Sequence, residues 1–345
     1  MASVLPTSHG AAEDALQPQH KVLKASEFEV STQDPVVQPM LLDGASLEPP
    51  RHHPVAWYVG QRFSEADDPD RMKEAWEAPM FVATKDPVSQ RPRTTVEELK
   101  LPEGCRAKRS TSAPSFARVV HNVLEPRECA EVLAAVNKKG FTPALVNIGS
   151  GMQIFEPGYR DSSRCVVDSS AFSAYLLEVI RPHLPALWRT KPPPNGRERN
   201  LIIDELNERC RFLVYHRRGQ SFAAHFDGSY VRPDDHPKAG ARSTVTVQLY
   251  FHDVPEAHGG ATTFLDASGG VARDVRCQPR CGSVLLFTQD LYHEGSKLFA
   301  GVKYTLRTEV MYRAPPDEQA SRKDSEGGQK PTKKKSAIWL ALHSR

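Results

Sequence analysis

Three residues of this chain have the types and the setting of a metal site. His225 and Asp227 form an H-x-D pair, and His293 lies much later in the sequence. The segments before them, Phe212–Tyr215 and Ser283–Phe287, are apolar and typical of β-strands. Two imidazoles and one carboxylate can occupy one face of Fe(II) and leave its other positions open to further ligands. The pattern therefore predicts a mononuclear iron centre, and a zinc hydrolase with the same ligands is the alternative.

The strand context gives the H-x-D pair a geometric reason. Successive side chains of a strand alternate between its faces, so His225 and Asp227 would project together while Phe226 points the other way. The third ligand then has to come from a neighbouring strand. However, the chain has 13 histidines, and a strand histidine is usually an ordinary surface or core residue. A second functional group is therefore needed to support a metal site.

Lys303 is the candidate for that second group. It lies near the start of the segment 302–307, ten positions after His293. An ammonium group is costly to bury unless an anion pairs with it. The distal carboxylate of 2-oxoglutarate would supply the anion while its 2-oxo acid end chelates the iron. Tyr215 and Tyr250, on flanking strands, could donate hydrogen bonds to the same carboxylate, although both are also common strand residues.

The remaining pattern predicts a mainly β protein with supporting helices. Apolar residues recur at helical spacing over 129–136 and over 172–180, and Pro182 ends the second helix because proline lacks an N–H. After Arg211, short apolar segments alternate with Gly, Pro and Asp, which is typical of a sandwich or jelly roll. The clearest predicted strands are 211–215, 222–226, 243–251, 261–265, 283–287 and 302–312.

The chain divides by composition into an extension, a domain and a tail. The ranges are 1–113, 114–314 (helical support 114–200, jelly-roll core 201–314) and 315–345. The extension is rich in Pro, Gln, Ser and charge, which is typical of a long, weakly ordered segment, although 56–110 could pack partly on the domain. The tail is polar, and its run Lys333–Lys335 is either a solvated charge cluster or a nuclear address.

Composition limits the function classes. The 345 residues carry 45 basic and 42 acidic side chains, and this balance gives no electrostatic argument for a nucleic-acid partner. The six cysteines are scattered and expected to be reduced; Cys277 and Cys281 lack the second pair that a structural zinc site needs. The sequence shows no signal peptide and no membrane-spanning run, so we expect a cytoplasmic or nuclear protein without a membrane contact.

Several ordered sequence blocks fall within 211–313. They are RFLVYHRRGQSFAAHFDGSYVRP, RSTVTVQLYF, GGATTFLD, CGSVLLF and LYHEGSKLFAGVKYTLRTEVMYR. Together they resemble the catalytic domain of the prolyl 4-hydroxylase-like branch of the Fe(II)/2-oxoglutarate dioxygenases. The upstream part from Phe116, including 160–164, is similar to the helical support region of that family. Two departures are Phe222, where relatives often carry tyrosine, and Lys297-Leu298, where they often carry Pro-Val.

The resemblance implies a double-stranded β-helix in which His225, Asp227 and His293 bind Fe(II) and Lys303 binds 2-oxoglutarate. Arg307, on the same strand face as Lys303, would assist the cosubstrate or contact the substrate. The implied reaction hydroxylates an unactivated C–H bond, most simply of a prolyl residue in a protein or peptide. It consumes O2 and converts 2-oxoglutarate to succinate and CO2, with ascorbate as the reductant.

Two other functions stay open. Arg307 and Arg313 have the R-x5-R spacing of nucleic-acid demethylating dioxygenases. That hypothesis ranks second because Lys303 already occupies the expected cosubstrate position. The other is a non-catalytic jelly-roll binding module. The natural substrate and the oligomeric state are not predicted.

Overall fold

The computed structural model describes residues 62–64, 93–106, 115–149, 152–190, 199–267 and 273–315. Most of the predicted extension, including Trp57 and Trp76, and the tail from 316 with its lysine run lie outside the described residues. Within the described part, no helix is long and apolar enough to cross a membrane.

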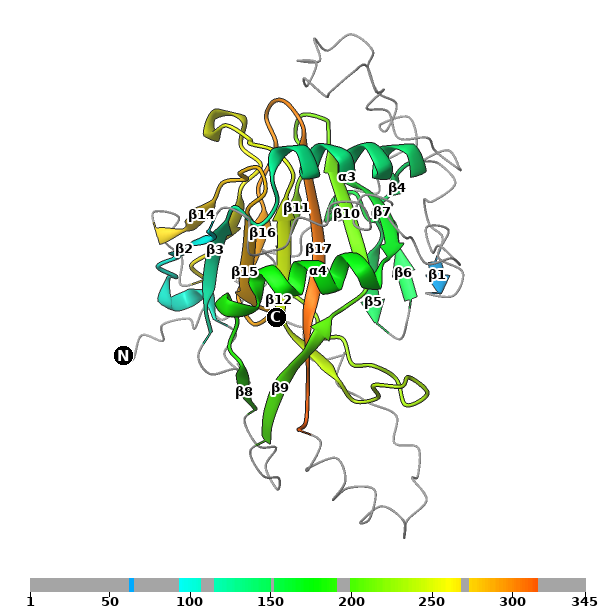
Figure 1. Ribbon diagram of the computed structural model, residues 1–345. Coiled ribbons are helices and arrows are strands. Elements are labelled where there is room, and N and C mark those ends of the chain that lie inside the picture. The colour runs from blue at the N-terminus through cyan, green and yellow to red at the C-terminus, as the bar shows by residue number, and fades with distance from the viewer. Residues whose placement is uncertain are drawn as a thin grey trace, which may run out of the picture.

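The core is a jelly roll of two antiparallel sheets, which confirms the predicted fold class (Figure 1). One sheet contains, in spatial order, β15 (Val284–Thr288), β12 (Arg242–Tyr250), β17 (Lys303–Arg313) and β10 (Arg209–Tyr215). The smaller sheet contains β11 (Phe222–His225), β16 (His293–Gly295), β13 (Thr262–Phe264) and β14 (Val275–Cys277). This order, with the chain crossing repeatedly between the sheets, is that of a jelly roll. Each of the six predicted strand segments overlaps one of these strands.

Further strands widen the larger sheet on both sides. They are β3 (Ala117–His121) and β2 (Thr95–Glu98) beyond β15, β7 (Ser163–Asp168) and β4 (Thr142–Pro143) beyond β10, and β9 (Arg199–Leu206) and β8 (Leu187–Thr190) beside the end of β17. A separate small sheet holds β1 (Arg62–Ser64), β6 (Met152–Ile154) and β5 (Val146–Gly149). In the described residues, short 3-10 helices span Glu103–Cys105, Arg181–His183 and Glu256–His258. The segment 114–200, predicted as helical support, thus also contributes strands, and part of 1–113 joins the sheet through β2.

Two helices cover the outer face of the larger sheet (Figure 1). Helix α3 (Pro126–Lys139) begins with a capping box, in which the backbone N–H of Glu125 donates to the Glu128 carboxylate at 2.8 Å. Proline at its first position fits the helix start, where no N–H is needed. Helix α4 (Ser170–Ile180) is capped by the Ser169 hydroxyl, which accepts from the Phe172 N–H at 3.3 Å.

Strand alternation separates an apolar outer face from a polar inner face. On β17, Leu306 and Val310 belong to the core beneath the helices. Lys303, Arg307 and Glu309 have the opposite parity and therefore face the smaller sheet. The charged side chains of the larger sheet are thus directed to the same interior that the ends of β11 and β16 approach.

Candidate metal centre

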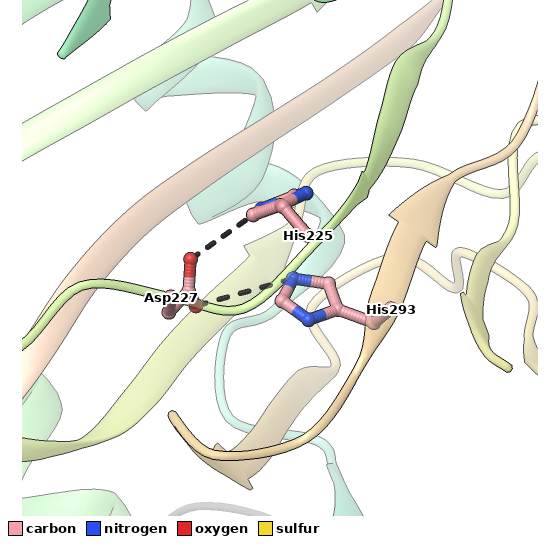
Figure 2. Close-up of side chains that lie close together, drawn as sticks. All are labelled: His225, Asp227 and His293. Carbon is pink, nitrogen blue, oxygen red and sulfur yellow. Dashed lines mark ion pairs between the residues drawn. The ribbon is translucent and has the colours of Figure 1, made fainter. Parts of the chain in front are cut away.

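The pairing of β11 with β16 brings the two histidines together. His225 and His293 are direct partners across this antiparallel pair, and their ring centroids are 4.4 Å apart. Asp227 lies just beyond the end of β11, so the chain path rather than strand alternation alone brings it to the site. Its Oδ1 is 3.6 Å from His225 Nε2, and its Oδ2 is 4.0 Å from His293 Nε2 (Figure 2). One ligand atom from each residue fits within 4.8 Å of the others, which suits a single ion.

Hydrogen bonds orient both imidazoles as ligands. The Nδ1 of His225 lies 2.7 Å from the Ala223 carbonyl oxygen, and that of His293 lies 2.9 Å from the Leu291 carbonyl oxygen. A carbonyl only accepts, so each Nδ1 carries the hydrogen and each Nε2 keeps its lone pair toward Asp227. Burial, and then the nearby His225, lower the pKa of His293 to about 4. His293 is therefore neutral near pH 7, as a metal ligand must be.

Asp227 is held in place by side chains from the larger sheet. The Thr246 hydroxyl donates to its Oδ2 at 2.6 Å, and Arg307 Nη2 lies 3.0 Å from its Oδ1. Burial alone would raise the pKa of Asp227, but Arg307, followed by the two histidines, outweighs it and holds the pKa well below its usual value. The site thus offers two imidazoles and one carboxylate, the donor set that suits Fe(II) with open positions.

A chain of buried charges continues from Asp227 along the inner face of the larger sheet. Arg307 Nη1 lies 3.4 Å from Glu309 Oε1, and Arg211 Nη1 lies 3.1 Å from the same oxygen. The Asn207 amide donates to the other Glu309 oxygen at 3.0 Å. Arg307 was expected to assist the cosubstrate or contact the substrate. In the structure it forms ion pairs with the candidate ligand Asp227 and with Glu309.

The second arginine of the R-x5-R spacing lies elsewhere. Arg313 Nε lies 2.7 Å from Asp204 Oδ1, and Arg313 pairs with Ile202 where β17 meets β9. The structure thus brings Arg307 to the metal centre but leaves Arg313 in a separate ion pair.

Lys303 is a buried cation on the same face of β17 as Arg307. It is 3% exposed, and its strand partner on β10 is Tyr215. Its Nζ lies 5.3 Å from the Tyr215 ring centroid, and no carboxylate pairs with it among the residues that the structure describes. Burial lowers its pKa to about 8. A cation with an aromatic neighbour and no anion is a ready binding group for an acidic ligand.

Tyr250 is less available than expected. Its buried hydroxyl donates a hydrogen bond to Thr262 Oγ1 at 2.9 Å and accepts one from the Gln248 amide at 3.2 Å. Burial holds the pKa of Tyr250 well above its usual value, so it remains a neutral phenol. A ligand carboxylate would have to replace the contact with Thr262 to receive this hydrogen.

The sequence did not predict the contacts that Thr246 and Phe222 make at this site. Thr246 shares the inner face of β12 with Gln248 and Tyr250, and strand alternation could have indicated it. Phe222 was noted only as a departure from tyrosine, yet its ring stacks on His225 with centroids 3.9 Å apart. Its apolar ring covers one side of the metal ligand.

The sequence matches no family model and no curated protein. Solved prolyl hydroxylases resemble it in structure. The collagen prolyl hydroxylase of Paramecium bursaria Chlorella virus-1 is 17% identical, with 59% of this chain and 99% of that chain covered and a TM-score of 0.37. The Pseudomonas putida prolyl-4-hydroxylase is 17% identical, with coverages of 68% and 100% and a TM-score of 0.36.

A third similar structure is the Trichoplax adhaerens prolyl hydroxylase, solved in complex with a hypoxia-inducible factor peptide fragment. It is 16% identical, with 59% of this chain and 86% of that chain covered and a TM-score of 0.41. These identities and TM-scores are low, and the function is therefore inferred from the chain's own residues.

Replacing His225 with alanine should abolish tight Fe(II) binding, because one of three ligands is lost. Removal of an outer partner of a ligand costs about 10- to 100-fold in metal affinity, and loss of a ligand itself should exceed that. Anaerobic calorimetric titration with Fe(II) measures the change. His183→Ala, which removes an imidazole outside the cluster, should bind Fe(II) like the wild type. Unchanged affinity in His225→Ala would exclude this metal site.

Replacing Arg307 with glutamine should destabilise the metal-free protein by about 3 kcal/mol, because Asp227 becomes a buried charge without its main partner. Fe(II) should restore much of this loss, because the ion supplies the missing positive charge. Urea unfolding with and without Fe(II), in the absence of O2, measures both effects. Arg313→Gln breaks an ion pair remote from the centre and should lose stability equally in both conditions. An equal loss in both conditions for Arg307→Gln would contradict the coupling.

Proposed function

We propose that this protein is an Fe(II)- and 2-oxoglutarate-dependent dioxygenase that hydroxylates a prolyl residue of a protein or peptide. One combination of features carries the proposal. A two-histidine, one-carboxylate set and a buried lysine without a carboxylate partner in the described part share one interior. The first suits Fe(II) with open positions, and the second suits the distal carboxylate of 2-oxoglutarate. Products would be the hydroxylated residue, succinate and CO2.

The residues divide the work between holding the metal and holding the cosubstrate. His225, Asp227 and His293 would hold Fe(II), which supplies the one-electron and O2 chemistry when bound. Arg307 and Thr246 keep the carboxylate of Asp227 ionised and fixed. Lys303 would bind the distal carboxylate through a charge-assisted hydrogen bond. Because the pKa of Lys303 in the protein without a bound ligand is about 8, its side chain is largely a cation near pH 7.

Aromatic rings around the metal centre favour a prolyl substrate. Phe222 stacks on His225, and Tyr159 meets the edge of Phe222 with centroids 5.6 Å apart. On the other side of the H-x-D pair, Phe226 is 44% exposed and lies 5.0 Å from the ring of Tyr292. Aromatic-lined grooves are a common means of binding proline-containing segments, whose extended conformation loses little entropy on binding.

Nucleic-acid demethylation receives no support from a specific contact. The proposal for that activity used the spacing of Arg307 and Arg313, which point to different ion pairs. We therefore propose the protein or peptide substrate.

Purified protein with Fe(II), ascorbate and 2-oxoglutarate should release succinate faster in the presence of proline-containing peptides. Peptides with alanine in place of proline are the control. Mass spectrometry should find one added oxygen atom on proline. Succinate release stimulated by methylated oligonucleotides but not by proline peptides would overturn the proposed substrate, and no release with any substrate would overturn the activity.

Replacing Lys303 with methionine should weaken 2-oxoglutarate binding about 10- to 100-fold, the usual effect of losing a hydrogen bond to a charged group. In the wild type, a cation with a pKa of about 8 is lost as pH rises, so the apparent Kd should be flat below that pH and should increase above it. Anaerobic titration of the Fe(II) protein across this range measures both effects. Lys303→Met should lose the pH dependence. An unchanged Kd in Lys303→Met would move the carboxylate anchor elsewhere.

A further inference from the structure

Arg160 is a second cation of the interior that the proposed chemistry does not use. Its segment is hydrogen-bonded along β11. The Ala223 N–H donates to the Tyr159 carbonyl at 2.7 Å, and the Asp161 N–H donates to the Ser221 carbonyl at 2.9 Å. Arg160 itself pairs with Phe222 in an antiparallel bridge. It therefore lies beside the strand that ends at His225.

The guanidinium of Arg160 has few partners. Its Cζ lies 4.7 Å from the Phe222 ring centroid, and its Nη1 donates to the Leu145 carbonyl at 3.2 Å. Its Nε is buried and has no hydrogen-bond partner.

The nearest acidic neighbour in the sequence is already occupied. Asp161 Oδ1 lies 2.8 Å from Arg217 Nη2 and accepts from the Gln220 amide at 3.1 Å. Among the residues that the structure describes, no carboxylate forms an ion pair with Arg160. The cation thus rests on an aromatic ring and one carbonyl oxygen.

The surroundings of Arg160 are positive. Burial is the main reason that its pKa is lowered to about 10; Tyr215 acts in the opposite direction, and the charges of Arg164, Arg307 and Arg211 lower the pKa further. Arg307 and Arg211 are balanced by Asp227 and Glu309. Fe(II) would add two positive charges and 2-oxoglutarate two negative charges, so binding both leaves Arg160 as uncompensated as before.

We propose that the substrate carries a carboxylate that binds Arg160, so that the reacting C–H bond is presented together with an acidic group. The inference rests on the proposed function and names the substrate class of that site. A guanidinium that has no carboxylate partner in the described residues suits an incoming carboxylate, with which it forms charge-assisted hydrogen bonds. One aromatic ring, Phe222, separates this subsite from His225.

Two sources could supply the carboxylate: an acidic side chain next to proline in a peptide, or the free carboxylate of a small prolyl compound. The probes are the blocked peptide Ala-Glu-Pro-Glu-Ala with its glutamine counterpart, and L-proline with L-prolinamide. Calorimetry on the full chain with Fe(II) and 2-oxoglutarate, without O2, measures binding before any turnover. In one of the pairs the acid should bind at least about tenfold tighter than the amide.

Arg160→Gln should bring that acid-to-amide ratio close to one, and Arg160→Lys should retain part of it. Arg189→Gln, which removes the same charge from an exposed residue of β8, should keep the wild-type ratio. Thermal unfolding of each variant checks folding. The wild-type ratio is a test by itself if Arg160→Gln does not fold. A ratio near one in the wild type for both pairs, a lack of binding by all four probes, or a ratio that persists in Arg160→Gln overturns the proposal.

Assays in air separate failure of this inference from failure of the proposed function. Equal hydroxylation of the acid and the amide in both pairs would leave prolyl hydroxylation standing and remove the carboxylate subsite. Tighter acid binding that depends on Arg160, without any hydroxylated product or succinate, would leave the subsite standing and remove the activity.

Discussion

The ion pair between Asp227 and Arg307 joins the two sheets of this jelly roll at the point where a metal would bind. Asp227 follows β11 of the smaller sheet, whereas Arg307 belongs to β17 of the larger one. Thr246 adds a second link from β12 to the same carboxylate. A buried carboxylate without such partners would take up a proton and lose its value as a ligand. The ligand set therefore depends on how the two sheets are stacked as well as on the local H-x-D sequence.

The inner face tolerates several charges because most of them are paired. Glu309 lies between Arg307 and Arg211 and receives a further hydrogen bond from Asn207, so this run of charges is internally balanced. Against that background, Lys303 and Arg160 differ from the other interior cations. Perturbed and unbalanced groups in an interior are typical of binding sites, because folding alone gives no reason to bury them. The two cations lie on different sheets: Lys303 is on β17 of the larger sheet, and Arg160 lies beside β11 of the smaller one.

The sequence was sufficient for features that depend on residue type and local period. The three proposed ligands, Lys303 and the main strands could be predicted because strand alternation and the apolar segments are local patterns. The joining of β2 and β7 to the larger sheet was missed, since strand pairing depends on contacts between distant segments. Arg307 shows the same limit, because parity gave its face but not its partner. The cosubstrate contact of Tyr250 stays a prediction, and its hydrogen bond to Thr262, on another strand, could not be predicted from the local pattern.

The hydrogen bonds along β11 tie substrate recognition to metal binding. Tyr159 and Asp161 are fixed by backbone bonds to Ala223 and Ser221, and Ala223 also accepts the hydrogen of His225 Nδ1. A displacement of this strand would move a metal ligand and Arg160 together. The backbone therefore fixes the distance between the start of the Arg160 side chain and the proposed metal ligand His225. If Arg160 binds a substrate carboxylate as proposed, this arrangement would select substrates by the distance between their carboxylate and their reacting carbon, which is a stricter criterion than the presence of proline alone.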